Sequence, residues 1–268
     1  MKQGNEPRRD VPVWQGVTTL KADNLVANIY KNRETMGTEA ANMVTAKITL
    51  LLDKQDFVNM IFAAAPSQNE FLSALVENKA VEWNRVNAFH MDEYIGLPQN
   101  DPRTFASFLN EKVFSQLPLH SVNYIKGNAA DPEMECNRYA RLLSKHSPDV
   151  VCMGIGENGH IAFNDPHVAN FNDYEKVKIV TLDTECRQQQ VNDGCFTVLN
   201  DVPAQAITLT IPELMAGKYI YCIVPGEKKA NAVFNTMNSE MIEKYPSTIL
   251  RKHANSILFL DQFSSSFL

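Results

Sequence analysis

The sequence alternates short apolar runs of strand length with longer segments of helical period. The runs 57–65 and 149–156 are almost continuously apolar, as expected of strands that are buried on both faces. Between 36 and 52, apolar residues recur at intervals of four, which indicates a long amphipathic helix. Repeated alternation of this kind predicts an α/β fold of three layers, in which a mainly parallel, Rossmann-like sheet has helices on both faces.

The remaining elements are expected in the same alternating order. Further strands are expected at 25–30, 85–90, 176–182, 206–211, 218–225 and 256–261. Further helices are expected at 66–78 with Ser67 as N-cap, at 103–114, at 131–146 with Pro132 in the first turn, at 184–192 and at 227–238. No linker rich in glycine, serine or proline divides the chain. The prediction is a polar N-terminal lead-in over 1–24 and a single α/β domain over 25–268.

Composition excludes several classes of function. A formal charge of −6 argues against non-specific nucleic-acid binding, which needs concentrated positive charge. No uncharged apolar stretch reaches the ~18 residues of a membrane span, and no apolar run follows the N-terminal arginines as in a secretory signal. The five cysteines are scattered without a CxxC pair, so neither a zinc site nor a disulfide framework is indicated. A cytoplasmic protein is predicted.

Two loops that follow predicted strands carry acid–base side chains, in the place where parallel α/β sheets bind ligands. The segment HMDEYIGLP (90–98) offers Asp92 and Glu93 as candidates for a general base, although a solvated turn explains them as well. The segment GIGENGHIAFNDP (154–166) combines three glycines with His160 and Asp165. Histidine can pass protons near neutral pH, which favours a functional site over a tight turn that His160 merely caps.

A third loop follows the strand at 57–65 and leads into a helix. In AAAPSQNEF (63–71), the helix N-terminus with the side chains of Ser67 and Gln68 offers donors to an anion. The simpler interpretation, that Ser67 only caps the helix, is favoured by this loop taken alone.

The two acid–base loops in this order, with PGEKKA (225–230) after them, resemble the glucosamine-6-phosphate deaminase (isomerase) family, within the superfamily that includes the 6-phosphogluconolactonases. The similarity extends from about residue 25 to residue 261. It implies aldose–ketose isomerisation and deamination of a 2-amino-2-deoxyhexose 6-phosphate in amino-sugar catabolism. Glucosamine 6-phosphate would give fructose 6-phosphate and ammonia, and neither a cofactor nor a metal is required.

The resemblance also implies roles for single residues. Asp92 would move a proton between C2 and C1, and His160 would open the pyranose ring. Asn158 and Asp165 would orient that histidine, and backbone amides of the glycine turn would stabilise the developing oxyanion. Asn158 stands where many members have aspartate, and Asp165 stands where glutamate is usual. An amide at 158 can orient His160 but supplies no charge.

The phosphate-binding part departs from the family pattern. The usual glycine–glycine–threonine–proline is replaced by APSQN, and the expected helix arginine aligns with Asn192. Lys229 falls at the position of the family's phosphate lysine, and Arg187 is either a substitute or an ordinary surface arginine. The groups expected to hold substrate are Ser67, Gln68, Gly156, Gly159, Arg187 and Lys229.

Two other functions stay open at this level. A sugar-lactone hydrolase would use His160 to activate water, and a sugar-phosphate-binding regulator would keep the fold without turnover. The lead-in before residue 25 is too short for a helix-turn-helix module. The expected partner is a small sugar phosphate, with no nucleic acid and no membrane. The resemblance adds a homo-oligomer as an option, because some family members form hexamers.

Overall fold

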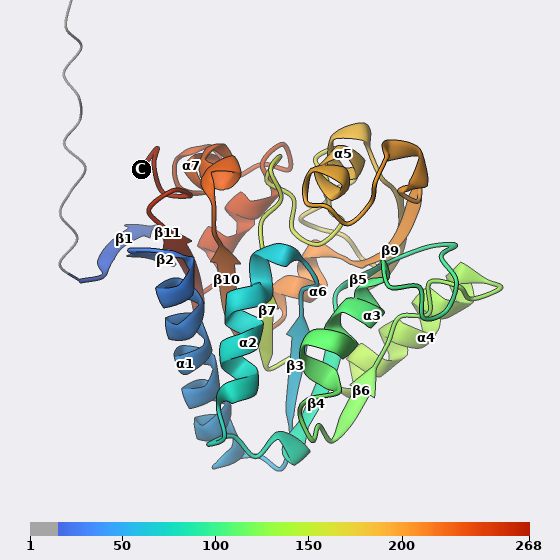
Figure 1. Cartoon of the computed structure of the whole chain (residues 1–268), viewed down its shortest axis with the longest axis horizontal. Coiled ribbons are helices and arrows are strands. Elements are labelled where there is room, and N and C mark those ends of the chain that lie inside the picture. Colours follow the sequence, from blue (N-terminus) through green and yellow to red (C-terminus); the bar gives the residue numbers. More distant parts are fainter. Residues whose placement is uncertain (1–15) are drawn as a thin grey trace, which may run out of the picture.

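The computed structural model describes residues 16–268 and contains an eight-stranded sheet in the order β1-β2-β11-β10-β7-β3-β4-β6 (Figure 1). Its strands are β1 Thr18–Ala22, β2 Leu25–Tyr30, β3 Val58–Phe62, β4 Val86–His90, β6 Ser121–Asn123, β7 Val150–Met153, β10 Tyr219–Val224 and β11 Ser256–Asp261. Every neighbouring pair from β2 across to β6 is parallel, and only β1 runs antiparallel to its neighbour. The predicted mainly parallel sheet is confirmed.

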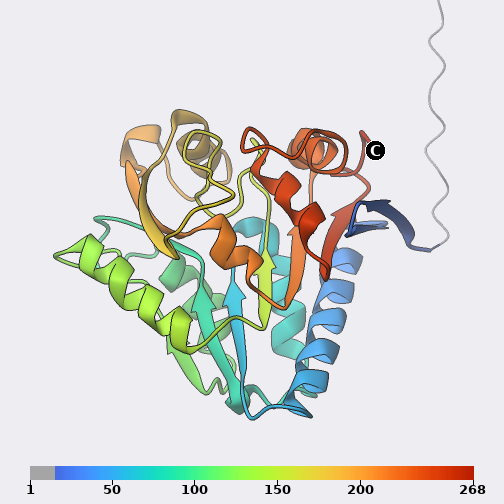
Figure 2. The same ribbon diagram turned by 180° about the vertical axis from the view of Figure 1, so that it is seen from behind.

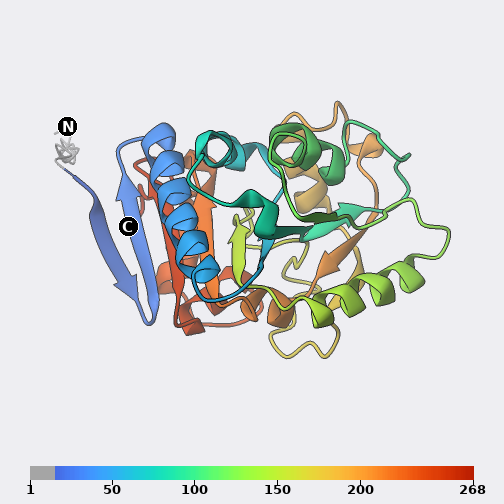
Figure 3. The same cartoon turned by 90° about the horizontal axis from the view of Figure 1, so that it is seen from below.

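Helices cover both faces of this sheet, as Figures 2 and 3 show. The helices are α1 Arg33–Leu52, α2 Asn69–Glu77, α3 Phe105–Leu109, α4 Pro132–Lys145, α5 Thr184–Asn192, α6 Ile211–Met215 and α7 Ala230–Asn238. In β3, Met60 and Phe62 pack with α1, α2 and α3, whereas Ile61 packs on the opposite face with α4, α6 and α7. This alternation along each buried strand produces two apolar cores and the expected three layers.

A second, smaller sheet has the order β5-β9-β8 and is antiparallel. Its strands are β5 Asp92–Tyr94, β9 Gln205–Leu209 and β8 Val177–Thr181. The strands expected near 176–182 and 206–211 therefore exist but lie outside the main sheet. The segment expected as a loop after residue 90 contains β5, which places Asp92 directly beyond the carboxyl end of β4.

Several local expectations need correction. Ser67 is not a helix cap: a 3₁₀ turn, Pro66–Gln68, precedes α2, and no side chain caps either element. The helix expected over 103–114 is split, because α3 ends at Leu109 and Asn110–Phe114 forms a wider π turn. Of the expected lead-in over 1–24, residues 1–15 lie outside the described range, and Thr18–Ala22 form β1, which pairs with β2. Within residues 16–268, no helix is long and apolar enough to cross a membrane.

Candidate active site

A cavity of about 70 Å³ lies beyond the carboxyl ends of β3, β4 and β7 and is bounded by α5. Five of the predicted groups line it together: Ser67, Asp92, Gly156, His160 and Lys229. Residues from seven separate segments complete the wall, namely Ala63, Ala64, Ala65, Met91, Phe105, Gly154, Ile155, Gly156, Ala162, Phe163, Gln189, Gln190 and Asp193. The three loops chosen from the sequence therefore meet at one site, as the position of ligands in parallel α/β sheets predicts.

The strand β5 separates the two candidate carboxylates. Side chains alternate along a strand, so Asp92 faces the cavity while Glu93 faces a second hollow of about 460 Å³ on the other side. Burial, and then the charge of Glu93, raise the pKa of Asp92 well above its usual value. Burial thus makes the Asp92 carboxylate a stronger base than an exposed one.

The side chain of Glu93 is instead held by the backbone. Its carboxylate accepts hydrogen bonds from the backbone N–H groups of Tyr94, Phe105 and Ala106, at 2.9–3.1 Å. Burial raises the pKa of Glu93 to about 7, although these three bonds oppose the shift. Orientation distinguishes the two carboxylates: of Asp92 and Glu93, only Asp92 lines the cavity with His160.

His160 is held from one side by two oxygen atoms. Its Nδ1 lies 2.8 Å from Asn158 Oδ1 and 2.9 Å from Asp165 Oδ1. Asn158 Oδ1 also accepts the backbone N–H of His160 at 3.0 Å, and Asn158 Nδ2 donates to Asp165 Oδ1 at 2.9 Å. Because both partners of Nδ1 accept, the proton of a neutral ring lies on Nδ1 and leaves Nε2 free to accept one from substrate.

The glycine turn contacts the His160 ring and fixes its position. A Cβ placed on Gly156 would lie 2.2–2.4 Å from three atoms of the His160 ring, so the ring rests directly on the Gly156 backbone. Gly159 does not line the cavity; it has φ +89°, a conformation that favours glycine. Two amides of the turn that was predicted to supply oxyanion donors are already used, because Gly156 N donates to His160 O and Gly159 N to Gly156 O. These two amides hold the turn closed.

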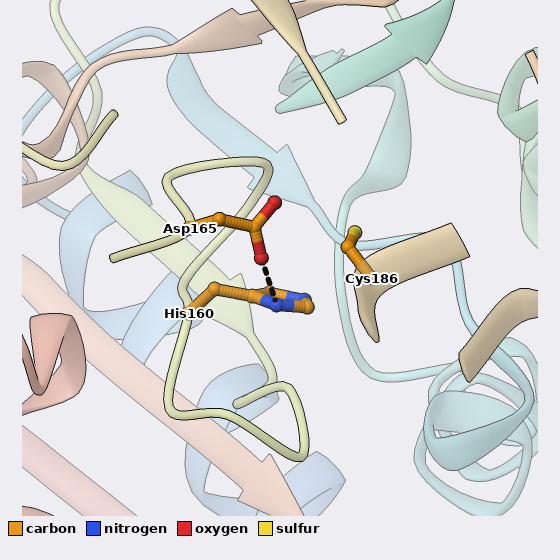
Figure 4. Close-up of side chains that lie close together, drawn as sticks. All are labelled: His160, Asp165 and Cys186. Carbon is orange, nitrogen blue, oxygen red and sulfur yellow. Dashed lines mark ion pairs between the residues drawn. The ribbon is translucent and has the colours of Figure 1, made fainter. Parts of the chain in front are cut away.

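Behind the histidine lies a buried cluster of Asp165 and Cys186, which Figure 4 shows from the loop and from α5 respectively. A ring nitrogen of His160, a carboxylate oxygen of Asp165 and Cys186 Sγ lie within 4.8 Å of one another. Burial alone would raise the pKa of Asp165, but the charge of His160 and hydrogen bonds from His160, Asn158 and Cys186 hold it below its usual value. An ionised Asp165 supplies the charge that Asn158 lacks.

These three atoms form a donor set that a thiophilic metal ion would accept. Burial and the neighbouring Asp165 raise the pKa of Cys186, which favours the protonated thiol. His160 Nδ1 is already engaged with Asp165 and Asn158. The described contacts are therefore those of a hydrogen-bonded relay behind His160.

The rest of the cavity wall includes Ser67, Lys229 and three side chains of the α5 segment that the sequence analysis missed. Those three are Gln189, Gln190 and Asp193. The run of three glutamines at 188–190, in a helix of little apolar periodicity, was the available signal. Gln68 does not line the cavity; its Nε2 donates to Ile223 O at 3.1 Å and to Ser67 Oγ at 3.2 Å, which positions Ser67.

Neither Asn192, which aligns with the family's phosphate arginine, nor Arg187, the possible substitute, lines the cavity. Asn192 is exposed and accepts a hydrogen bond from Gln188, one turn earlier on α5. Arg187 donates from Nη2 to Leu199 O at 2.8 Å and to Val202 O at 2.9 Å, and it does not line the cavity. Arg187 therefore holds the chain that follows α5.

The fold and the cavity together define an α/β protein with acid–base groups beyond the ends of its parallel strands. A family model described as glucosamine-6-phosphate isomerases/6-phosphogluconolactonase matches residues 31–259, and the chain belongs to this family. It is 35% identical over 189 residues to a glucosamine-6-phosphate deaminase of Bacillus cereus, which covers 70% of each chain. It is 33% identical over 206 residues to one of Streptococcus sanguinis, covering 77% of this chain and 85% of that one.

Solved structures share the fold. A monomeric glucosamine-6-phosphate deaminase superposes with a TM-score of 0.82 at 24% identity, covering 91% of this chain and all of that one. A 6-phosphogluconolactonase from Thermotoga maritima superposes with a TM-score of 0.73 at 19% identity, covering 88% and 99%. At these identities the likeness establishes the architecture, and the chemistry has to be argued from the cavity.

Proposed function

We propose that this chain isomerises and deaminates a 2-amino-2-deoxyhexose, a reaction whose family form converts glucosamine 6-phosphate to fructose 6-phosphate and ammonia. The observation that carries the proposal is that Asp92 and an oriented His160 line one cavity. The sequence identity of 33–35% between this chain and glucosamine-6-phosphate deaminases also supports the proposal.

The chemistry divides between these two groups. Free Nε2 of His160 accepts the proton of the anomeric hydroxyl and returns a proton to the ring oxygen, which opens the sugar. Asp165 and Asn158 hold the ring in the required tautomer during both transfers. The Asp92 carboxylate then removes the proton from C2, so that an enediol-like intermediate forms across C1 and C2.

Ammonia leaves from the carbon that Asp92 deprotonates. Return of the proton to C1 converts the amine at C2 into an imine, and water adds to that imine carbon. Collapse of the adduct breaks the C–N bond, expels ammonia and leaves a ketone at C2, so atoms and electrons balance without an added oxidant. A raised pKa suits Asp92 to this work, because it must take up and release the same proton.

Substrate entry requires the cavity to open. Its volume of about 70 Å³ is below the ~300–1,000 Å³ common in ligand sites. Gln189 Oε1 accepts the backbone N–H of Glu157 at 2.9 Å, and this bond joins α5 to the histidine loop over the cavity. We infer that α5 moves away from that loop when substrate binds.

An ammonia-coupled assay tests the proposed chemistry. Glucosamine and galactosamine, each with and without a 6-phosphate, are supplied to the purified chain, and ammonia and the ketose product are measured in parallel. Ammonia and ketose in equal amounts are expected. Hydrolysis of 6-phosphogluconolactone without any ammonia release would instead support the lactonase alternative, in which His160 activates water.

A further inference from the structure

His90 is a buried histidine that the chemistry proposed above does not use. It is the last residue of β4, and only Met91 separates it from Asp92, the first residue of β5. Its side chain is fully buried, and it does not line the cavity. A buried imidazole has two polar nitrogens, and each of them needs a hydrogen-bond partner inside the protein.

Both ring nitrogens of His90 have backbone partners. The backbone N–H of Ile125, in the loop after β6, donates to Nε2 at 2.8 Å. A nitrogen that accepts carries no proton, so the proton of the neutral ring lies on Nδ1. Nδ1 lies 2.9 Å from the backbone oxygen of Asp92 and therefore donates to it. Burial lowers the pKa of His90 to about 4, although the bond to Asp92 and the charge of Glu135 oppose the shift, so the ring is neutral at pH 7.

The ring bonds to Asp92 on the side that faces away from β9. Leu209 N donates to Met91 O at 2.8 Å. Hydrogen-bonded pairs alternate with non-hydrogen-bonded pairs along an antiparallel ladder, so the next residue, Asp92, turns its carbonyl away from β9. The strand β5 is only three residues long and lies at the edge of the small sheet. Its pairing with β9 therefore holds Asp92 from one side, and the His90 ring holds it from the other.

Tyr139 of α4 in turn fixes the backbone of His90. Its hydroxyl accepts the backbone N–H of His90 at 3.0 Å and donates to the backbone oxygen of His90 at 2.9 Å. The His90 ring also lies edge-on to the rings of Tyr124 and Tyr139, at centroid distances of 6.0 and 6.3 Å. Contacts from α4 and from the loop after β6 thus set the position of the ring that bonds to Asp92.

We propose that His90 is a positioning residue that holds the general base, Asp92, in place at the cavity. This inference rests on the deaminase chemistry proposed above and adds a residue to it. His90 does not line the cavity and moves no proton in the reaction. Its Nδ1–H fixes the peptide group that carries the Asp92 side chain, and a displacement of about 1 Å in a reacting group costs roughly 10²-fold in rate.

Two substitutions at position 90 separate the bond to Asp92 from the bond to Ile125. The amide of an asparagine takes the place of Nδ1, so His90→Asn can still donate to Asp92 O but loses the acceptor for Ile125 N. The amide of a glutamine reaches the place of Nε2, so His90→Gln can still accept from Ile125 N but loses the donor to Asp92 O. Each variant leaves one buried backbone group without a partner, so comparable falls in Tm are expected.

The kinetic readout is ammonia release from whichever of the four sugars in the assay above the wild type converts best. His90→Gln is expected to lower kcat at least about tenfold with little change in KM, whereas His90→Asn is expected to lower it less than about threefold. Equal losses of kcat in the two variants, or a larger loss in His90→Asn, would overturn the inference and leave the deaminase proposal standing. Ammonia from none of the four sugars would overturn both.

The tautomer of His90 supplies a test that needs no variant. The ¹⁵N chemical shifts of a histidine ring distinguish a proton on Nδ1 from a proton on Nε2, and the wild type is expected to carry it on Nδ1 at pH 7. A proton on Nε2 would remove the donor to Asp92 O, and would overturn the inference whether or not the two variants fold.

Discussion

Two groups of residues at the cavity differ in how many of their side chains already have hydrogen-bond partners. At the reacting end, His160 Nδ1, both side-chain atoms of Asn158 and one oxygen of Asp165 all have partners at 2.8–3.0 Å. A second group of lining residues, which we call the remote end, consists of Ser67 and Lys229 with the side chains of the α5 segment. Among residues 16–268, Lys229 and Gln190 take part in none of the ion pairs or side-chain hydrogen bonds described above. One end is fixed before substrate arrives, and the other keeps unsatisfied groups for the substrate to satisfy.

This difference separates chemistry from selectivity. Acid–base groups need a geometry held within a fraction of an ångström, so their supporting contacts must exist in the free protein. Groups that recognise a hydroxyl gain their hydrogen bonds only on binding and contribute to discrimination between substrates. Mutations at the reacting end should therefore lower kcat, whereas mutations at the remote end should change KM and the choice of sugar.

Asp92→Asn should have the largest effect on turnover. It removes one of the two carboxylates, Asp92 and Asp193, that line the cavity among the described residues, and a positioned general base contributes about 10²–10⁴-fold to rate. Ammonia release is expected to fall by that factor, with little change in KM, in the coupled assay.

The stability of the same variant supplies its control. Since the pKa of Asp92 is raised above its usual 3.8 in the folded chain, folding binds a proton above that pH, and raising the pH destabilises the wild type. The Tm of Asp92→Asn should match that of the wild type near pH 3.8 and exceed it at pH 8. A variant that is inactive and also less stable at pH 8 would argue against a catalytic role.

Gly156→Ala should rank second. The added Cβ would lie 2.2–2.4 Å from the His160 ring, so the ring must move away from Asn158 and Asp165. A displacement of about 1 Å costs roughly 10²-fold in rate. Gly154→Ala is the matched control, since its Cβ would approach nothing closer than Gln68 Nε2 at 3.1 Å. Steady-state kinetics should show a fall in kcat for the first and a smaller change for the second; equal losses would contradict this account of the ring.

The sequence could predict the main sheet because its strands are apolar on both faces and several of its helices, such as α2, α4 and α7, have a clear apolar period. It could also place Asp92 and His160 at strand ends. Which of Asp92 and Glu93 faces the cavity depended on a three-residue strand, β5, whose partner β9 lies more than a hundred residues later. Local pattern carries no signal for such a pairing.

The remote end was harder to predict for a related reason. The alignment placed Asn192 at the arginine position, but the helical turn of α5 directs Gln189 and Gln190 into the cavity and leaves Asn192 exposed. A shift of two residues rotates a side chain by more than half a turn of a helix. Arg187 was ambiguous because its two carbonyl partners, at Leu199 and Val202, lie in and directly after a short 3₁₀ turn, Leu199–Asp201, which the sequence analysis did not expect.

Asn158→Asp tests the hydrogen-bonded relay behind His160 and should change the rate less than Gly156→Ala. Asn158 Nδ2 now donates to Asp165 Oδ1 at 2.9 Å, and the substitution replaces this amide by a second carboxylate. Two carboxylates at such a short distance do not both ionise easily. The pKa of Asp165, now below its usual value, should rise, so the acid limb of the kcat/KM profile should move to higher pH by about one unit or more. An unchanged acid limb would mean that ionised Asp165 is not needed for turnover.

Ser67→Ala should have the smallest effect of these variants, and it should change KM alone. The variant removes one neutral hydroxyl, whose hydrogen bond to substrate is worth about 0.5–1.5 kcal/mol, so KM is expected to rise about threefold to tenfold. Gln68 keeps its bond to Ile223 O at 3.1 Å, so the wall itself should hold its shape. The kcat value should stay within about twofold of the wild type, because Ser67 touches neither Asp92 nor the relay behind His160. If kcat instead fell as far as in Gly156→Ala, the two ends of the cavity would act as one unit, and the division between fixed chemistry and adaptable recognition would be wrong.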